Sequence, residues 1–306
     1  MLDSRWVREN ADVVRDAATR KRLDPSVVDS FLEKDRAHRD VLLRVENLRA
    51  ELKTSSKKLG KMDPAERETA LVTQREVKSE LKELEKQEQG LRAEVYGFAM
   101  LLPQPPADDV PDGKDDLDNI EVATVGKVPQ FDFEAKSHDD LGEKLGIIDI
   151  KRGVKLSGSR NYLLLGDAAR LERAALQYAL DHMIQRGFEM VSVPTLVKRE
   201  CMEGTGYFPG GEEQAYIAER DDLALVGTSE VPLTAIHSGE TLDFGRLPLR
   251  RVALSPCYRR EAGTYGKDTK GLYRVHQFWK VEQVVLGPAD DDWSLQEHKA
   301  MLKHST

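Results

Sequence analysis

The sequence predicts an α+β protein in which a long N-terminal antiparallel two-helix coiled coil precedes a globular domain built around an antiparallel sheet. In the first hundred positions, apolar residues recur at alternating steps of three and four, which is typical of a coiled coil. Later positions mix strand-like and helix-like runs without regular βαβ repeats, and two charged strand-like runs are joined by a Gly- and Lys-rich loop. We place the two domains at residues 1–103 and 104–306.

The coiled coil is predicted from two seams joined by the turn-like stretch GKMDPAE. Gly60 fits a helix end, and Asp63 followed by Pro64 fits a helix start. Each helix would hold about 34 residues and extend roughly 50 Å, at about 1.5 Å per residue. The first seam comprises Val41, Val45, Leu48, Leu52, Ser55, Leu59 and Met62, and the second Ala70, Gln74, Val77, Leu81, Leu84, Glu88, Leu91, Val95, Phe98 and Leu102.

An excess of basic residues on the first of these helices suggests an anionic ligand. The chain has a formal net charge of −8, so a nucleic acid would need a local basic surface. Between Val41 and Met62 the acidic residues are Glu46 and Glu51, whereas the basic ones are Arg44, Arg49, Lys53, Lys57, Lys58 and Lys61. This strip favours a phosphate backbone as the ligand. A dimerising or spacer coiled coil explains the same periodicity, because a run of charge is usually a solvated face.

Composition limits the compartment and the cofactors. Of the 306 residues, 40% are hydrophobic and 33% charged, which describes a soluble protein. Cys201 and Cys257 are far apart and form no CxxC spacing, which argues against a zinc site and favours a reducing compartment. The N-terminus lacks an apolar signal-peptide core, and no apolar run of membrane-spanning length occurs. We therefore expect a cytoplasmic protein with no membrane partner.

The globular part begins after a Pro- and Asp-rich linker at residues 103–118. Residues 153–166 read as strand, turn and strand, and residues 188–197 read as one strand whose Pro194 belongs at an edge or an interface. Residues 168–187 predict an amphipathic helix that ends at Gly187. Its apolar stripe would be Leu171, Ala174, Ala175, Tyr178, Ala179 and Met183. The chain contains neither GxGxxG nor GxxxxGK[ST], so neither of these phosphate-binding loops is indicated.

The chemistry is concentrated in the two charged runs, which we read as strands around a hairpin loop at 264–273. Because side chains alternate along a strand, Arg259 and Glu261 share a face on the first run. The corresponding face of the second run holds Arg274, His276, Phe278, Lys280 and Glu282, with Val275, Gln277, Trp279 and Val281 opposite.

This row suits ATP and an amino acid. Arginine grips phosphate oxygens, an aromatic ring stacks on a purine, and a carboxylate accepts hydrogen bonds from amines. Lys267 and Lys270 of the loop could reach outer phosphates. A half-exposed sheet with solvent-facing ion pairs is the alternative.

The run CYRREAGTYGKDTKGLYRVHQFWKVEQV resembles motif 2 of class II aminoacyl-tRNA synthetases, in particular of seryl-tRNA synthetases. GTSEVPLTAIHSGE resembles the serine-binding loop of that family, GTGYFP its active-site approach and GFEMVSVPTLV its motif 1. The helical hairpin stands where the family carries its tRNA-binding arm. The resemblance implies a class II catalytic domain at 104–306 that activates L-serine to seryl-adenylate with ATP and Mg²⁺. It also implies seryl transfer to tRNA(Ser) and a homodimer formed through motif 1.

The resemblance also assigns residues. It makes Arg259 and Arg274 the catalytic residues, Arg259 on the α-phosphate and the serine carboxylate and Arg274 on the outer phosphates. Glu261 would read the adenine amino group and Phe278 would stack on the ring, with Arg260, Val275, His276 and Gln277 completing the ATP site. The serine site would hold Thr228, Ser229, Glu230, Arg259 and Glu282, with Mg²⁺ near Glu282. The residues that bind tRNA would be Arg49, Lys53, Lys57, Lys58 and Lys61.

Some of these residues have plainer interpretations. Thr228, Ser229 and Glu230 could cap a helix, and Glu282 could pair with Lys280 or with Arg259.

The family continues past the point where this sequence stops, and motif 3 is absent. Residues 293–306 read as a helix cut off mid-pattern. We therefore expect a fragment with reduced or no activity. Two other functions remain open: a non-enzymatic tRNA-binding or scaffold protein, and an amino acid:carrier protein ligase.

Overall fold

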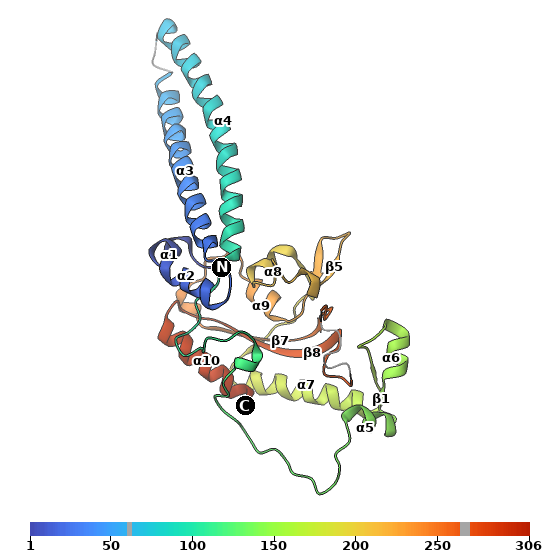
Figure 1. Cartoon of the computed structure of the whole chain (residues 1–306). Coiled ribbons are helices and arrows are strands. Elements are labelled where there is room, and N and C mark those ends of the chain that lie inside the picture. The colour runs from blue at the N-terminus through green and yellow to red at the C-terminus, as the bar shows by residue number, and fades with distance from the viewer. Residues whose placement is uncertain (60–62, 264–269) are drawn as a thin grey trace. The chain divides into compact units, whose positions relative to one another are not determined.

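The computed structural model describes residues 1–59, 63–263 and 270–306, which divide into two compact units, Met1–Glu121 and Val122–Thr306 (Figure 1). The predictions for Gly60, Lys61, Met62 and Lys267 lie outside these ranges, as do the side chains of Lys58, Leu59 and Pro64. The α+β class is confirmed: long helices dominate the first unit, and the second combines helices with an antiparallel strand pair.

The first unit is the predicted helical hairpin with a small helical base (Figure 1). It contains α1 (Ser4–Glu9), α2 (Ala11–Arg20), α3 (Ser26–Leu59), α4 (Pro64–Leu101) and the 3₁₀ turn η1 (Asp116–Asp118). Helix α4 begins at Pro64, as predicted, and the Asp63 carboxylate accepts a hydrogen bond from the Glu66 amide at 3.0 Å. The base packs Val7, Val14, Val28, Phe31, Ala99 and Leu102 into one apolar cluster.

The seam between α3 and α4 follows the predicted positions. Val45 is buried in it, and the buried Gln74 donates its side-chain amide to the Ser55 hydroxyl at 2.8 Å. A second polar contact joins His38 Nε2 and the Glu88 carboxylate at 2.9 Å. Polar pairs inside a coiled coil favour one register, because any slip leaves them without partners. The hairpin therefore specifies its own alignment.

The described residues of the second unit form three small sheets, with strand orders β3-β7-β8, β4-β6-β5 and β1-β2. Strands β7 and β8 form a ten-residue antiparallel pair that runs from Leu249 opposite Leu286 to Tyr258 opposite Gln277. The elements are α5 (His138–Lys144), β1 (Ile148–Asp149), α6 (Ile150–Ser157), β2 (Leu163–Leu164), α7 (Asp167–Gln185), β3 (Glu189–Met190), β4 (Leu196–Lys198), α8 (Arg199–Gly204), η2 (Glu212–Gln214), β5 (Tyr216–Ala218), β6 (Leu223–Leu225), α9 (Glu230–Ala235), η3 (Phe244–Arg246), β7 (Leu249–Tyr258), β8 (Gln277–Leu286) and α10 (Asp291–Ser305).

Helix α7 packs on one face of the β7–β8 pair, as Figure 1 shows. Leu180, Met183 and Phe188 form a buried cluster with Val252, and Leu254, Val281 and Val285 pack against it. In an antiparallel pair, facing residues share a side of the sheet. The other side, which carries Phe278, Lys280 and Glu282, therefore lies away from α7.

Three local predictions are wrong. Residues 153–157 belong to helix α6, because Asp149 caps that helix by accepting from the Arg152 amide at 2.8 Å. Gly153 lets the helix approach the backbone of Tyr162, where a Cβ would lie only 2.4 Å from the Tyr162 Cα. Residues 188–197 form two short strands rather than one, with Pro194, which has no N–H to donate, between them.

The third error concerns the apolar stripe of α7. Leu171 and Tyr178 are 70% and 74% exposed, whereas Met183 is buried, as predicted, together with Leu180, which the predicted stripe did not include. Four of the six predicted members, Leu171, Ala174, Ala175 and Tyr178, lie on the outer face, where they repeat at helical spacing, so periodicity alone identified the buried side only at Met183.

Candidate active site

The site lies where β7 ends and β8 begins. Strand β7 ends at Tyr258, earlier than predicted, and β8 begins later than predicted, at Gln277. Arg259 and Glu261 therefore follow the first strand, and Arg274 precedes the second. One further backbone bond, from the Arg259 amide to the His276 carbonyl at 3.0 Å, continues the pairing. Strand alternation is therefore the wrong explanation for Glu261, whose φ of 51° places it in the left-handed region.

Three predicted ATP residues nevertheless converge on one cavity of about 400 Å³. Arg259, Glu261 and Arg274 line it, together with Tyr207 and Gln214. The Arg274 guanidinium donates to the Glu261 carboxylate at 2.9 Å. The Arg259 guanidinium carbon lies 5.2 Å from the centroid of the Phe278 ring, a cation–π distance. Two cations, one carboxylate and one aromatic face thus meet at one end of the strand pair.

The predicted serine residues divide into two groups. Thr228 is fully buried and donates its hydroxyl to the Glu282 carboxylate at 2.7 Å, and Lys280 forms an ion pair with the same carboxylate. Ser229 is also fully buried, but its hydroxyl shares a 2.6 Å hydrogen bond with Ser255. Glu230 is exposed. Thr228 and Glu282 therefore form one polar unit, while Ser229 joins the loop to β7.

The capping interpretation of this loop accounts for little. Ser229 occupies the N-cap position of α9, yet its side chain makes no capping hydrogen bond. A local bond to a side chain runs instead from the Glu230 amide to the Thr228 hydroxyl at 3.2 Å.

The remaining predicted ATP residues are not among those that line this cavity in the described part of the chain. The Arg260 guanidinium donates to the Glu213 carbonyl at 3.2 Å. Val275 is buried, Gln277 is exposed, and His276 Nδ1 lies 3.0 Å from the Arg259 carbonyl oxygen. His276 also meets the Tyr216 ring edge-on. The side chains of Arg260 and His276 thus contact backbone carbonyl oxygens near the strand ends.

Two residues that sequence reasoning missed hold the motif-2 backbone. The Gln214 side chain donates to the Ala262 carbonyl at 2.9 Å and accepts from the Ala262 amide at 3.0 Å. Arg160, whose φ is 60°, donates to the Glu261 carbonyl at 3.2 Å, and its own carbonyl accepts from the His276 amide at 3.3 Å. Neither residue belongs to a periodic run, so its sequence neighbours carry no signal of this role.

Tyr207 is the third missed residue and lies in the stretch GTGYFP, which resembles the active-site approach of the family. It lines the cavity, and burial raises the pKa of its phenol, with a further contribution from the nearby Glu230 charge. The phenol therefore stays protonated at neutral pH and can donate a hydrogen bond into the cavity.

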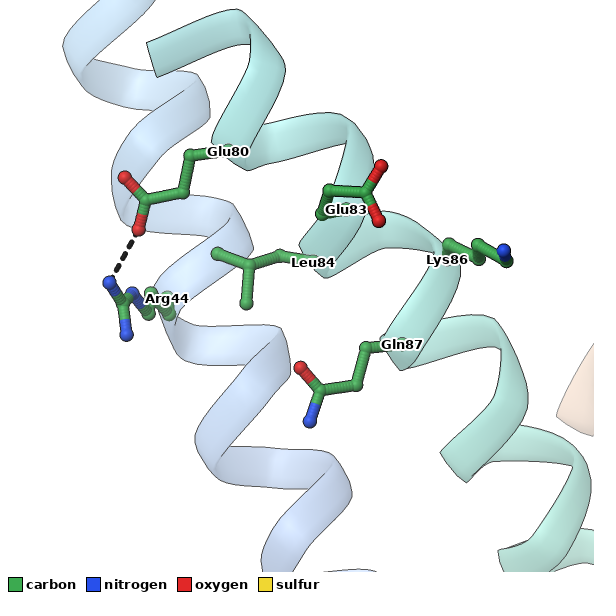
Figure 2. A pocket seen from close by; sticks show the side chains of 6 residues that line it. All are labelled: Arg44, Glu80, Glu83, Leu84, Lys86 and Gln87. Carbon is green, nitrogen blue, oxygen red and sulfur yellow. Dashed lines mark hydrogen bonds and ion pairs between the residues drawn. The ribbon is translucent and has the colours of Figure 1, made fainter. Parts of the chain in front are cut away.

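The basic strip of the arm is partly neutralised across the hairpin. Arg49 pairs with Glu85 at 2.7 Å, and Figure 2 shows the Arg44 guanidinium directed at the Glu80 carboxylate, with Leu84 pointing from α4 toward α3. Lys53 and Lys57 are exposed and make no ion pair with the described residues. Among the predicted tRNA-binding residues whose side chains the structure describes, these two lysines carry the charge that is least compensated within the hairpin.

Two features are absent from the described residues. No helix there is long and apolar enough to cross a membrane. No group of three or more His, Cys, Asp or Glu side chains is arranged to hold a metal ion in that part of the chain.

Comparison with known proteins first gives the class. Residues 214–304 match the class II core domain of the G, H, P, S and T tRNA synthetases. This range contains β7, β8 and the motif-2 residues around the cavity. The fold is thus that of a class II aminoacyl-tRNA synthetase.

The particular family follows from the rest of the chain, and the chain belongs to the seryl-tRNA synthetases. Residues 1–106 match the seryl-tRNA synthetase N-terminal domain. The serine--tRNA ligase of Rhodococcus opacus is 43% identical over 303 residues, 99% of this chain and 72% of that protein. The serine--tRNA ligase of Deinococcus radiodurans is 40% identical over 305 residues, 100% of this chain and 72% of that protein.

Solved structures agree with this placement. The seryl-tRNA synthetase of Pyrococcus horikoshii, complexed with ATP, superposes with a TM-score of 0.85 at 35% identity, covering 98% of this chain and 73% of that one. The cytoplasmic serine-tRNA ligase of Naegleria fowleri, in complex with AMP, gives a TM-score of 0.80 at 26% identity, covering 97% and 68%.

Proposed function

We propose that this chain activates L-serine with ATP to form seryl-adenylate and passes the seryl group to tRNA(Ser). The observation that carries the proposal is the juxtaposition of two polar units on one strand pair. The first unit is the cavity lining of Arg259, Glu261 and Arg274. The second is the hydrogen-bonded pair of Thr228 and Glu282, of which Glu282 belongs to β8. Solved relatives bound to ATP and to AMP support ATP as the co-substrate.

In this proposal a serine carboxylate oxygen attacks the α-phosphorus of ATP. A new P–O bond forms, the bond to the β-phosphate breaks, and pyrophosphate leaves. Arg259 stabilises the charge that develops on the α-phosphate, and Arg274 holds the outer phosphates. No side chain acts as a nucleophile, so the rate depends on positioning and charge neutralisation.

The Arg274–Glu261 ion pair joins two side chains that we assign to ATP. When ATP binds, the adenine amino group can donate a hydrogen bond to the Glu261 carboxylate, while the Arg274 guanidinium turns to phosphate oxygens. Phe278, already beneath the Arg259 guanidinium, offers its ring to the purine.

Glu282 would recognise the serine itself. Its carboxylate can accept from the substrate ammonium and hydroxyl, and the Thr228 hydroxyl fixes its orientation. The Lys280 ammonium, which pairs with Glu282 here, would be displaced or would remain as a counter-charge.

Mg²⁺ would enter with ATP. Mg²⁺ commonly binds through one or two carboxylates plus phosphate oxygens and keeps several waters, so it needs no protein cage of three ligands. Glu282 is the carboxylate that we assign to it. Its role would be to neutralise charge on the phosphates.

For tRNA binding, the helical hairpin supplies five candidate residues that would contact phosphates of the tRNA: Arg49, Lys53, Lys57, Lys58 and Lys61. Each is a sequence prediction, and the exposure of Lys53 and Lys57 supports those two.

We assign a homodimer to the motif-1 region. Leu171, Tyr178 and Met190 are exposed apolar residues on α7 and β3, and large exposed apolar groups that cluster mark interaction surfaces. A cytoplasmic location completes the proposal.

The experiment is ATP–pyrophosphate exchange with serine, threonine, alanine and cysteine measured side by side. Exchange that depends on serine supports the proposal. Exchange that prefers another of these amino acids, or that proceeds without any, contradicts it.

A further inference from the structure

Helix α5 touches the motif-2 segment just before Arg274. The His138 Nε2 atom accepts a hydrogen bond from the Leu272 backbone amide at 2.8 Å, across 134 residues of sequence. The His138 ring also meets the Tyr273 ring edge-on, with centroids 4.8 Å apart and an interplanar angle of 82°. One imidazole therefore contacts two consecutive residues of this segment.

The chemistry of the contact fixes the tautomer. A backbone amide only donates, so Nε2 must carry a lone pair and the ring proton sits on Nδ1. The imidazole acts as an acceptor for a loop amide that has no partner in the β7–β8 ladder, which begins at Gln277. An aromatic residue without a ring acceptor could keep the Tyr273 contact but not this bond.

The local backbone is built for close approach. Gly271 has a φ of +74°, and a Cβ there would lie 2.3 Å from His138 Nε2. Any other residue would collide with the imidazole and would strain the backbone. Lys270 adds two longer ion contacts, 3.9 Å to Asp139 and 3.8 Å to Asp140, but its exposed ammonium makes these weak. The hydrogen bond to Leu272 is thus the specific element of the contact.

We propose that His138 is a positioning residue for ATP binding, acting through Leu272 on Arg274. Arg274 follows Leu272 by two residues and lines the cavity, where its guanidinium pairs with Glu261. Only Tyr273 separates Leu272 from Arg274, and so short a segment has few backbone conformations. Fixing the Leu272 amide therefore restricts the positions that the Arg274 side chain can adopt. This inference rests on the proposed ATP site, since it assigns Arg274 to the outer phosphates.

Three variants separate the hydrogen bond from the ring contact. His138→Gln places an amide oxygen near the position of Nε2 and keeps an acceptor. His138→Phe keeps a ring for Tyr273 and removes the acceptor. His298→Ala, at an exposed histidine on α10, is the control for loss of an imidazole.

Hydrogen exchange of the Leu272 amide measures whether the hydrogen bond to His138 is present. Calorimetric titration measures the affinity for ATP. We expect His138→Phe to lose Leu272 protection and to weaken ATP binding by about tenfold, the upper range for one hydrogen bond. His138→Gln and the His298 control should stay within about twofold of the parent chain in both readouts. Unchanged ATP affinity in His138→Phe despite lost protection overturns the inference, as does equal weakening in the Gln variant.

The proposed function is tested apart from this inference. ATP titration needs no catalysis, so a chain that binds ATP but shows no serine-dependent exchange refutes the proposed activity and leaves the His138 result interpretable. A parent chain that does not bind ATP refutes both.

Discussion

The Thr228 hydroxyl donates to the Glu282 carboxylate at 2.7 Å and so connects the loop before α9 to the middle of β8. The two residues are 54 positions apart, and Thr228 has no exposed surface. A buried hydroxyl that orients a carboxylate gives that carboxylate one direction in which to accept hydrogen bonds. In the proposed reaction that direction is where serine binds.

Replacing Thr228 by valine tests this pair. Valine keeps the shape and removes the donor, which leaves the Glu282 carboxylate less well oriented at a cost of about 1–3 kcal/mol. We expect the KM for serine to rise about tenfold or more, since about 1.4 kcal/mol is a factor of ten, while the KM for ATP changes little. Thr234→Val, at an exposed threonine on α9, is the matched control. A Thr228→Val enzyme with an unaltered serine KM would show that the pair is structural only.

Glu261 allows a test that separates backbone strain from chemistry. Its φ of 51° suits glycine, and a side chain there costs roughly 1–2 kcal/mol. We expect Glu261→Gly to be more stable than Glu261→Ala by about 1 kcal/mol, since the two share the loss of the carboxylate. Both should weaken ATP binding. Urea unfolding compares the variants, and equal stabilities would mean that the left-handed conformation carries no penalty.

The arm predicts a salt-dependent contribution to tRNA binding. Replacing Lys53, Lys57 and Lys58 by alanine should weaken tRNA binding and reduce the slope of log affinity against log salt by about 0.9 for each phosphate that the arm no longer neutralises. The control replaces Lys78, Lys82 and Lys86, three exposed lysines of α4, and changes the net charge equally. If both sets alter the slope to the same extent, the strip on α3 is not the specific surface.

The exposed side of α7 predicts the oligomeric state. Sedimentation equilibrium should report two chains for the parent protein and one for the Leu171→Asp/Tyr178→Asp double variant, because a charge cannot be buried unpaired at an apolar interface. Leu156→Asp, equally exposed on α6, should leave the parent state intact. A monomeric parent chain, or a double variant that still pairs, would remove α7 from the interface.

The two cysteines should differ in reactivity toward a thiol reagent. Cys257 is fully buried in β7, and burial raises the pKa of its thiol, so at pH 8 it stays protonated and unreactive. Cys201 is partly exposed. We expect one thiol to react in the folded protein and a second only after unfolding or at higher pH. Two fast-reacting thiols in the folded chain would contradict the burial of Cys257.

Sequence reasoning predicted the elements whose signal is local and periodic. The coiled-coil seam, including its polar members Ser55 and Gln74, needed only a repeat of three and four. The β7–β8 pair was identified as well, although the prediction extended both strands too far into the loop that joins them. There Glu261 departs from the strand in a left-handed conformation that no alternation pattern announces.

What sequence reasoning missed depends on contacts between distant segments. Arg160, Gln214 and His138 act through backbone groups of motif 2, and a backbone acceptor or donor leaves no trace in residue type. Most of the apolar stripe predicted for α7 was misplaced for a related reason. Both faces of this helix carry apolar residues, and only the packing of Leu180 and Met183 on the sheet distinguishes them. The domain boundary at 103 remains a prediction.

The most direct test of the central claim is calorimetric titration of the chain with non-hydrolysable seryl-, threonyl- and alanyl-adenylate analogues. The cavity of Arg259, Glu261 and Arg274 with its Thr228–Glu282 neighbour predicts that the seryl analogue binds most tightly and that ATP competes with it. The alanyl analogue should lose the most affinity, because it leaves the Glu282 carboxylate without the hydroxyl it would bind. Equal affinity for all three analogues, or no binding of any, would contradict the account.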